Sequence, residues 1–534
     1  VAGREFLIPW NISKQFWELY EKPTPERPLY PFNAEPVEQF VEKYKGARDV
    51  PLFASKLVVP VVHINDLPQF LQDGSPFLKY LRDTRAPFAV NINYGSARMS
   101  EAEGRAAWKL LTGELKGQFI GWVSGESIGY VYDEAAASMK LSPTMPRREL
   151  LEAHRVAYTS ALEKKWGALF HTAAGPMWDK LIVAQATSST TYAHALGRWG
   201  SRLVGIETAA VQPNTAMRVA FTRGAARQYG GAFLYYHAPN FGDTATTFTE
   251  LQNFAGPDHF FHTRYGATMG PSLAWYRKSY YLYYMAGASA IYLEQGFDQF
   301  FRPGPGERPL QLNPLGRITE EFMRFAEKHP ERGVPYTPVA FLLDPAHGWD
   351  MTDYPQWPFG VSQIDRGDRA LRELFGAAYY PASVTEGEPA TADRQAFVNA
   401  VFGDVFDVLV ASDEGAGAID AYRALVVGGR VAWPRGWDAR LKDYVRRGGT
   451  VVVNAAQAEG LTRELLGVRP LGATAEGEDA RCLAPNEPAA DVGGQVFRYE
   501  RVELRGARTL VETRSGDPLV TVNRFGRGRV VFCA

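Results

Sequence analysis

The feature that most constrains the fold is a regular alternation of short apolar runs and helical runs over the first ~330 residues. Eight apolar runs rich in Val, Ile and Phe are predicted as strands, which is the strand count of a (β/α)8 barrel. Most of them lack a polar face, as expected for parallel strands that are covered on both sides. The predicted strands are residues 6–11, 57–64, 88–94, 118–124, 181–186, 203–207, 232–237 and 289–294.

The stretches between these strands have the spacing of apolar residues that is typical of helices. One helix after each strand completes the pattern of a barrel enclosed by a ring of helices. The predicted helices are residues 37–45, 76–82, 101–111, 148–166, 191–199, 216–229, 273–285 and 318–328.

A polar stretch with three prolines, residues 328–338, follows the barrel and is predicted as a linker. A second α/β pattern then predicts a doubly wound, flavodoxin-like layer, and short β-runs follow from about residue 470. We therefore expect a barrel over residues 1–330, a flavodoxin-like domain over 331–470 and a β-rich C-terminal segment over 471–534. The predicted elements are strands 339–343, 405–410, 422–427, 450–454, 496–499, 519–523 and 529–532, and helices 369–374, 396–402 and 441–447.

Composition excludes several classes of protein. The 58 basic and 59 acidic residues leave a net charge of −1, which argues against binding of nucleic acid by a basic surface. The two cysteines, Cys482 and Cys533, exclude a disulfide framework, a zinc ribbon and thioredoxin-like chemistry. The most apolar stretch, residues 279–293, is shorter than the ~20 residues that a bilayer requires, so no membrane partner is expected. Neither a P-loop nor a GxGxxG after a strand is present, and we expect no cofactor.

Three glutamates stand where the predicted barrel would carry an active site. Glu126, Glu207 and Glu294 follow the fourth, sixth and eighth strands, and barrel enzymes place their chemistry at the carboxyl ends of the strands. Any one of them alone fits a salt bridge at the rim or a charge at a helix N-terminus. Three together favour glycosidic bond cleavage, in which one carboxylic acid protonates the leaving oxygen and a second carboxylate attacks the sugar or activates water.

Other residues at the strand ends fit the binding of a sugar. Aromatic faces stack on the C–H surfaces of sugars, and Asn and His hydrogen-bond hydroxyl groups. Taken singly, each aromatic residue fits the core more readily than a ligand site. The predicted substrate-binding residues are Trp10, Asn11, His63, Asn91, Asn93, Tyr94, Trp122, Ser124, Tyr235 and His237, with Asn65 and Tyr236 beside them.

Several motifs resemble one family. The fourth strand ends Gly121-Trp-Val-Ser-Gly-Glu126, and segments 406–410, 422–429, 441–453 and 518–531 resemble the amidotransferase-like domain that follows the barrel in family 42 β-galactosidases. More broadly, the chain is similar to the clan of retaining glycoside hydrolases that carry an acid/base on strand four. The resemblance implies that Glu126 is the acid/base. It also implies a non-catalytic second domain that mediates oligomerisation, so we expect a homo-oligomer, a dimer or a trimer.

The seventh strand departs from that clan, which places its nucleophile there. The predicted strand 232–237 ends Tyr235-Tyr-His237 without a glutamate, so the second carboxylate is Glu207 or Glu294. We favour Glu207, because a separation of two strands keeps it on the same side of the cleft as Glu126. Glu294 lies nearly opposite, where it would reach across or fix a substrate hydroxyl. A separation of ~5 Å between the carboxylates predicts retention and ~6.5–9.5 Å predicts inversion, and the sequence leaves both open.

The predicted function is a glycoside hydrolase that acts on an oligo- or polysaccharide by a two-carboxylate mechanism. The alternative is a catalytically silent, carbohydrate-binding or scaffold barrel. A metal-dependent hydrolase is less favoured, because the nine histidines form no HxH or HExxH motif, although His259 and His262 stand near Asp258. Amidotransferase activity requires a cysteine after strand 422–427, where Gly428-Gly429-Arg430 stands instead.

The two ends of the sequence leave the compartment and the full length open. The sequence opens at Val1 without a methionine, which is consistent with a processed leader. We favour a secreted or periplasmic location over a cytoplasmic one. Ala534 comes directly after a predicted strand, which leaves open a further C-terminal piece.

Overall fold

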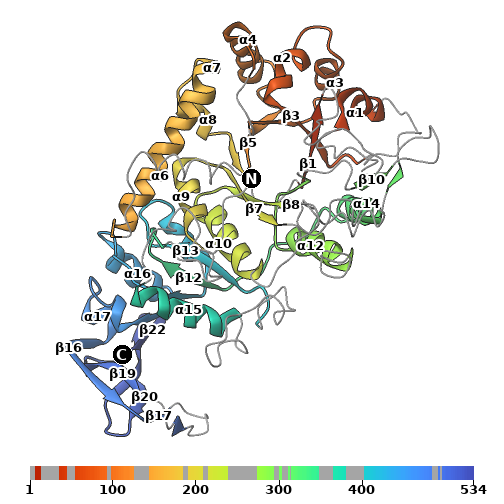
Figure 1. The fold of residues 1–534 in the computed structure, drawn as a ribbon. Coiled ribbons are helices and arrows are strands. Elements are labelled where there is room, and N and C mark those ends of the chain that lie inside the picture. Colours follow the sequence, from red (N-terminus) through yellow and green to blue (C-terminus); the bar gives the residue numbers. More distant parts are fainter. Residues whose placement is uncertain are drawn as a thin grey trace, which may run out of the picture.

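Eight parallel strands of the described residues form a closed barrel in the computed structural model (Figure 1). The ring closes where Trp10 of the first strand pairs with Leu293 of the last, and β2 (Glu35–Pro36) pairs with the end of β1. All eight predicted strands are therefore confirmed. They are β1 (Ile8–Ser13), β3 (Val58–His63), β4 (Phe88–Asn91), β5 (Phe119–Ser124), β6 (Leu181–Val183), β7 (Leu203–Thr208), β8 (Ala232–His237) and β9 (Ala290–Leu293).

The structure describes residues 6–13, 35–44, 55–92, 98–125, 144–184, 190–208, 215–237, 273–293, 300–302, 311–312, 314–347, 365–379, 402–483, 491–492 and 496–534.

Helices surround the barrel at the predicted places. Their ends follow local chemistry: Ser100 caps α4 in a reciprocal capping box with Glu103, and Ser75 caps α3 just before Pro76. The predicted helix 148–166 differs in part, because its last turns, Leu162–Gly167, are π-helical. The helices are α1 (Val37–Tyr44), α2 (Leu67–Phe70), α3 (Pro76–Thr84), α4 (Glu101–Thr112), α6 (Arg147–Ala161), α7 (Ala168–Phe170), α8 (Ala174–Trp178), α9 (Tyr192–Trp199), α10 (Thr215–Gln228), α12 (Leu273–Met285) and α14 (Pro314–Lys328). Strands β10 (Phe301–Arg302) and β11 (Gln311–Leu312) form an antiparallel pair.

The second sheet has the strand order of a flavodoxin-like fold. Its parallel part runs β13-β12-β14-β15-β22, which is the 2-1-3-4-5 order of doubly wound sheets. The strands are β12 (Val339–Leu343), β13 (Phe406–Val410), β14 (Ala424–Val427), β15 (Thr450–Asn454) and β22 (Gly528–Cys533). The helices of this part are α15 (Arg366–Tyr379), α16 (Trp437–Arg446) and α17 (Arg463–Leu466), and the predicted helix 396–402 lies outside the described residues apart from its last residue.

The C-terminal segment belongs to this same sheet. Strand β22 is the fifth parallel strand, and antiparallel strands continue the sheet beyond it. A separate ribbon of β16 (Val468–Gly477) and β19 (Phe497–Leu504) adjoins it. The stretch expected to be a distinct β-rich tail therefore completes the flavodoxin-like layer. The antiparallel strands are β21 (Pro518–Phe525), β20 (Arg508–Thr513), β17 (Ala480–Cys482) and β18 (Asp491–Val492).

The barrel docks on the edge strand β13 of the second sheet through α10. The two backbones come so close that a Cβ atom built on Gly224 would lie 1.8 Å from the carbonyl oxygen of Val408. The side-chain amide of Gln228 pairs with Val410 like a short strand, donating to its carbonyl and accepting from its N–H, both at 2.9 Å. His194 of α9 donates to the Val408 carbonyl at 2.9 Å. Side chains of the barrel thus satisfy backbone groups that an edge strand normally exposes.

A buried ion cluster fixes the same interface. The Asp407 carboxylate, which is fully buried, accepts from Arg223 Nε at 2.7 Å, from the Tyr422 hydroxyl at 2.7 Å and also from Arg227. Arg223 reaches Asp404 with its two terminal nitrogens at 2.6 and 2.7 Å. Burial opposes the charge of Arg223, but the two carboxylates outweigh it and raise the pKa of Arg223 above its usual value.

Candidate active site

The alternation of side chains along β7 directs Glu207 into the barrel. Leu203 on the same strand packs against the cluster of buried side chains that fills the barrel interior, among them Val61, Leu234 and Tyr236. Side chains two and four residues further along a strand lie on the same face, so Glu207 shares the inner face with Leu203. Since β7 ends at Thr208, the Glu207 carboxylate stands at the carboxyl end of the barrel, half-buried.

A row of polar and aromatic groups continues from Glu207 across the neighbouring strands. In the register of the sheet, Glu207 is paired with Tyr236, and Tyr236 is paired with Tyr292. The rings of the two tyrosines lie 4.8 Å apart, and both side chains are buried. The Tyr292 hydroxyl donates to Asn11 Oδ1 at 2.6 Å and so connects β9 with β1. The inner row therefore runs from Glu207 through Tyr236 and Tyr292 to Asn11.

His63 and Asn91 form a second pair on the inner face. They are partners in the register of β3 and β4, and each follows by two residues a side chain of the interior cluster, Val61 and Ala89. His63 Nδ1 accepts a hydrogen bond from the Asn65 N–H at 3.2 Å, which fixes the orientation of the imidazole ring. Both predicted residues thus lie at the carboxyl ends of their strands with side chains directed into the barrel.

Other predicted binding residues are one position out of phase and face the surrounding helices. The indole of Trp122 stacks on Trp108 of α4 at 6.0 Å, and Tyr235 stacks on Tyr283 of α12 at 4.0 Å. The hydroxyl of Ser124 lies 2.6 Å from that of Tyr158 on α6. These contacts place Trp122, Ser124 and Tyr235 in the core between the barrel and the helices. For the two aromatic residues this is the alternative that the sequence left open. The prediction that the three residues bind the sugar at the strand ends is therefore corrected.

Trp10 and His237 also belong to that outer core. The indole N–H of Trp10 donates to the buried Glu35 at 2.9 Å. The imidazole of His237 is fully buried, with its Nδ1 2.7 Å from the hydroxyl of Tyr235 and its Nε2 3.2 Å from that of Tyr280. Burial lowers the pKa of His237 to about 3, so the ring is neutral near pH 7. Neither side chain takes part in the inner row, which corrects their assignment to the sugar-binding rim.

Four of the predicted site residues, Glu126, Glu294, Asn93 and Tyr94, lie outside the described residues. Their roles stay predictions. Of the three predicted catalytic glutamates, Glu207 is the one whose position the structure describes. Tyr292 is a member of the inner row that the sequence analysis missed. Its signal is the alternation itself, because Tyr292 shares the phase of Ala290 inside the barrel.

Within the described part of the chain, no group of three or more His, Cys, Asp or Glu side chains is arranged to hold a metal ion. His259, His262 and Asp258 lie outside that part.

None of the helices described is both long and apolar enough to span a membrane.

The class that the fold defines is a (β/α)8 barrel followed by a flavodoxin-like domain. In structure the chain is similar to the β-galactosidase from Bacillus circulans sp. alkalophilus, with a TM-score of 0.53 and 10% identity over 100% of this chain and 86% of that one. It is also similar to the β-galactosidase from Rahnella sp. R3, with a TM-score of 0.51 and 12% identity over 100% and 86% of the two chains. At these identities the likeness shows the fold, and it confirms the architecture that the motifs predicted. No protein-family model matches the sequence, and no curated protein matches it.

Proposed function

We propose that the protein is a glycoside hydrolase in which Glu207 supplies one of the two catalytic carboxylates. The observation that carries the proposal is the position of Glu207, on the inner face at the carboxyl end of β7, where barrel enzymes carry their active sites. The similarity in fold to two β-galactosidases agrees with it. Cleavage of a glycosidic bond uses a pair of carboxyl groups, and Glu207 would supply one of them.

In this proposal Glu126 protonates the leaving oxygen, and Glu207 attacks the anomeric carbon or activates a water molecule. Glu294, which directly follows β9 in the sequence, is the other candidate for the second carboxylate or for a contact with a substrate hydroxyl. The configuration of the first product decides between attack and water activation. Retention, followed by NMR of the released sugar, indicates a covalent intermediate, and inversion indicates an activated water.

The inner row supports a binding role for Asn11. Its carboxamide oxygen accepts from the Tyr292 hydroxyl, which orients the amide at the carboxyl end of the barrel. A fixed amide binds a sugar hydroxyl with less loss of conformational entropy than a mobile one. Tyr236 lies between Glu207 and Tyr292 in the register and packs against Tyr292. We assign Asn11 to the substrate, and the two tyrosines to positioning Asn11 and Glu207.

The test is turnover of a panel of aryl glycosides by the parent chain and by Glu207→Gln. β-Galactosides are the first substrates to try, because they are what the two similar structures are named for. We expect Glu207→Gln to lower kcat/KM by about 10²–10⁴-fold, the usual contribution of a positioned acid or base. Glu459→Gln, the same change at an exposed glutamate of the second domain, is the matched control.

Unchanged turnover by Glu207→Gln would remove Glu207 from the mechanism. Turnover lost in Glu294→Gln but kept in Glu207→Gln would transfer the role to Glu294. If the parent chain binds oligosaccharides yet hydrolyses none of the panel, the silent carbohydrate-binding barrel replaces the enzyme.

A further inference from the structure

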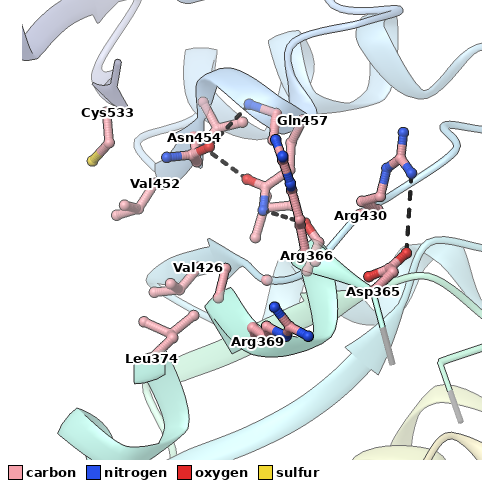
Figure 2. Close-up of a pocket in the computed structure, with 17 residues that line it drawn as sticks. Asp365, Arg366, Arg369, Leu374, Val426, Arg430, Val452, Asn454, Gln457 and Cys533 are labelled. Atoms are coloured by element: carbon pink, nitrogen blue, oxygen red, sulfur yellow. Dashed lines mark hydrogen bonds and ion pairs between the residues drawn. The ribbon is translucent and has the colours of Figure 1, made fainter. Parts of the chain in front are cut away.

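A second candidate site lies in the flavodoxin-like domain. A cavity of about 720 Å³ opens where β14, β15 and β22 end, next to the first turn of α15 (Figure 2). Its volume falls within the ~300–1,000 Å³ that is typical of small-molecule sites. In doubly wound sheets, ligands bind beyond the carboxyl ends of the strands, where the strand order reverses. Here the order reverses between β12, which has β13 on its other side, and β14. The cavity lies between the first turn of α15, which follows β12 in the chain, and the loop that follows β14.

The cavity is positively charged. Arg366, Arg369 and Arg430 line it, and Asp365 is the one acid among the described residues of its wall. Arg430 lies 4.0 Å from Asp365, and both side chains are exposed. Within the part of the chain that the structure describes, Arg366 and Arg369 have no acidic partner within 4 Å. Three guanidinium groups facing one carboxylate leave a formal excess of two positive charges.

The arginines, rather than the end of α15, would hold an anion. The first turn of that helix is already capped, since Asp365 Oδ1 accepts from the Asp368 N–H at 3.0 Å and Asp368 Oδ2 accepts from the Asp365 N–H at 2.8 Å. Arg147 of the barrel holds Asp368 with two hydrogen bonds of 2.8 and 2.6 Å. Arginine donates several N–H groups in a planar fork that matches the oxygens of a phosphate.

The remaining wall of the cavity is mostly apolar. Figure 2 shows Val426, Val452, Leu374 and Cys533 around the cavity, on the side away from Arg430. Burial raises the pKa of the Cys533 thiol, so it lines the cavity as a neutral group rather than as a nucleophile.

The loop after β14 is held by Gln457, whose side-chain amide donates to the carbonyl of Gly429 at 2.7 Å. Gly429 has a φ of 67°, a conformation that favours glycine. A Cβ atom on the neighbouring Gly428 would lie 2.6 Å from Leu371 Cδ1. The glycine pair therefore lets this loop pass close to α15 without filling the cavity with side chains.

We propose that this cavity binds a small phosphorylated molecule, with its phosphate held by the three arginines and its uncharged body lying along the apolar wall. The inference goes beyond glycoside hydrolysis and does not depend on it, because every described residue that lines the cavity belongs to the second domain.

The test is isothermal titration of the intact chain with AMP and with glucose 1-phosphate. Adenosine, glucose and inorganic phosphate serve as reference probes. We expect at least one phosphomonoester to bind at least tenfold more tightly than inorganic phosphate and more tightly than its neutral parent. Arg366→Ala and Arg369→Ala should each weaken that binding by about tenfold or more, because each removes charge-assisted hydrogen bonds. Both side chains are exposed, so the variants should fold normally, and thermal unfolding checks this.

Arg440→Ala is the matched control, since Arg440 is an exposed arginine of α16 that does not line the cavity. The proposal is overturned if neither phosphomonoester binds at about 1 mM, an affinity typical of weak ligands. It is equally overturned if both arginine variants bind like the parent chain. Equal affinity for inorganic phosphate and for the esters would refute the assigned ligand class.

Discussion

Replacing Asp407 by asparagine removes the charge at the centre of the ion cluster between the two domains. The carboxylate is fully buried and accepts hydrogen bonds from Arg223, Arg227, Tyr422 and, at 3.1 Å, Thr337. Asparagine keeps one acceptor oxygen, but its amide N–H groups turn toward donors. Two charge-assisted bonds of about 1.5–3 kcal/mol each are lost, and truncation of one partner in a buried ion pair typically costs about 3–5 kcal/mol. We therefore expect Asp407→Asn to lower the free energy of unfolding by about 3–5 kcal/mol.

The assay is unfolding in urea followed by circular dichroism and by intrinsic fluorescence. Because a two-domain chain need not unfold in one step, the midpoint of each transition is compared with that of the parent chain. Asp420→Asn is the matched control, since Asp420 pairs with Arg447 on the surface and such pairs contribute about 0–1 kcal/mol. A loss below about 1 kcal/mol in Asp407→Asn, equal to the control, would refute the reasoning that this cluster holds the domains together.

Three further changes test the interface and the inner row. Gly224→Ala should destabilise the protein by about 1–3 kcal/mol or more, because its Cβ would lie 1.8 Å from a backbone oxygen, whereas Gly417→Ala has open space and should leave the melting temperature unchanged. Burial lowers the pKa of His194 to about 4, so the unfolded chain takes up a proton below about pH 6.5 while the folded chain does not. Stability should therefore fall by up to about 3 kcal/mol between pH 6.5 and 4, and a His194→Gln variant with the same slope as the parent would contradict this. Tyr292→Phe removes the hydrogen bond to Asn11 and should raise KM for the best glycoside more than it lowers kcat. An unchanged KM would refute the role of Tyr292 in positioning Asn11.

The sequence predicted the layout of the fold because that layout is encoded locally. Strands buried on both faces appear as uninterrupted apolar runs, and capping residues such as Ser75 and Ser100 mark where helices begin. Local patterns say nothing of distant pairing, however. Strand β22 inserts beside β15 although about 70 residues separate them, so the C-terminal stretch looked like a tail of its own. The π-helical turn after α6 has the same composition as an ordinary helix and gave no separate signal.

The candidate site was predicted only in part, because position along a strand and direction of a side chain are separate matters. Trp122 and Tyr235 stand at strand ends as much as Asn11 does, yet they point to the helices. A shift of one residue along a strand reverses the face, and the apolar runs of a barrel do not reveal which phase points inward. Once Leu203, Leu234 and Ala290 are known to face the interior, the inward-facing positions of each strand can be assigned. Glu207 and Tyr292 lie an even number of residues from Leu203 and Ala290, so their side chains also point inward.

The way the barrel covers β13 has a consequence for how the chain can be cut. An isolated fragment of residues 331–534 would lose His194, Arg223 and Gln228, and so expose the carbonyls of Phe406, Val408 and Val410 along a free strand edge. Such an edge is a template for addition of a strand from another molecule. We therefore do not expect the flavodoxin-like layer to be stable as an isolated, monomeric domain. Cloned alone, it should pair with copies of itself or precipitate, and a fusion that keeps α9 and α10 in place would be needed to hold it as a monomer.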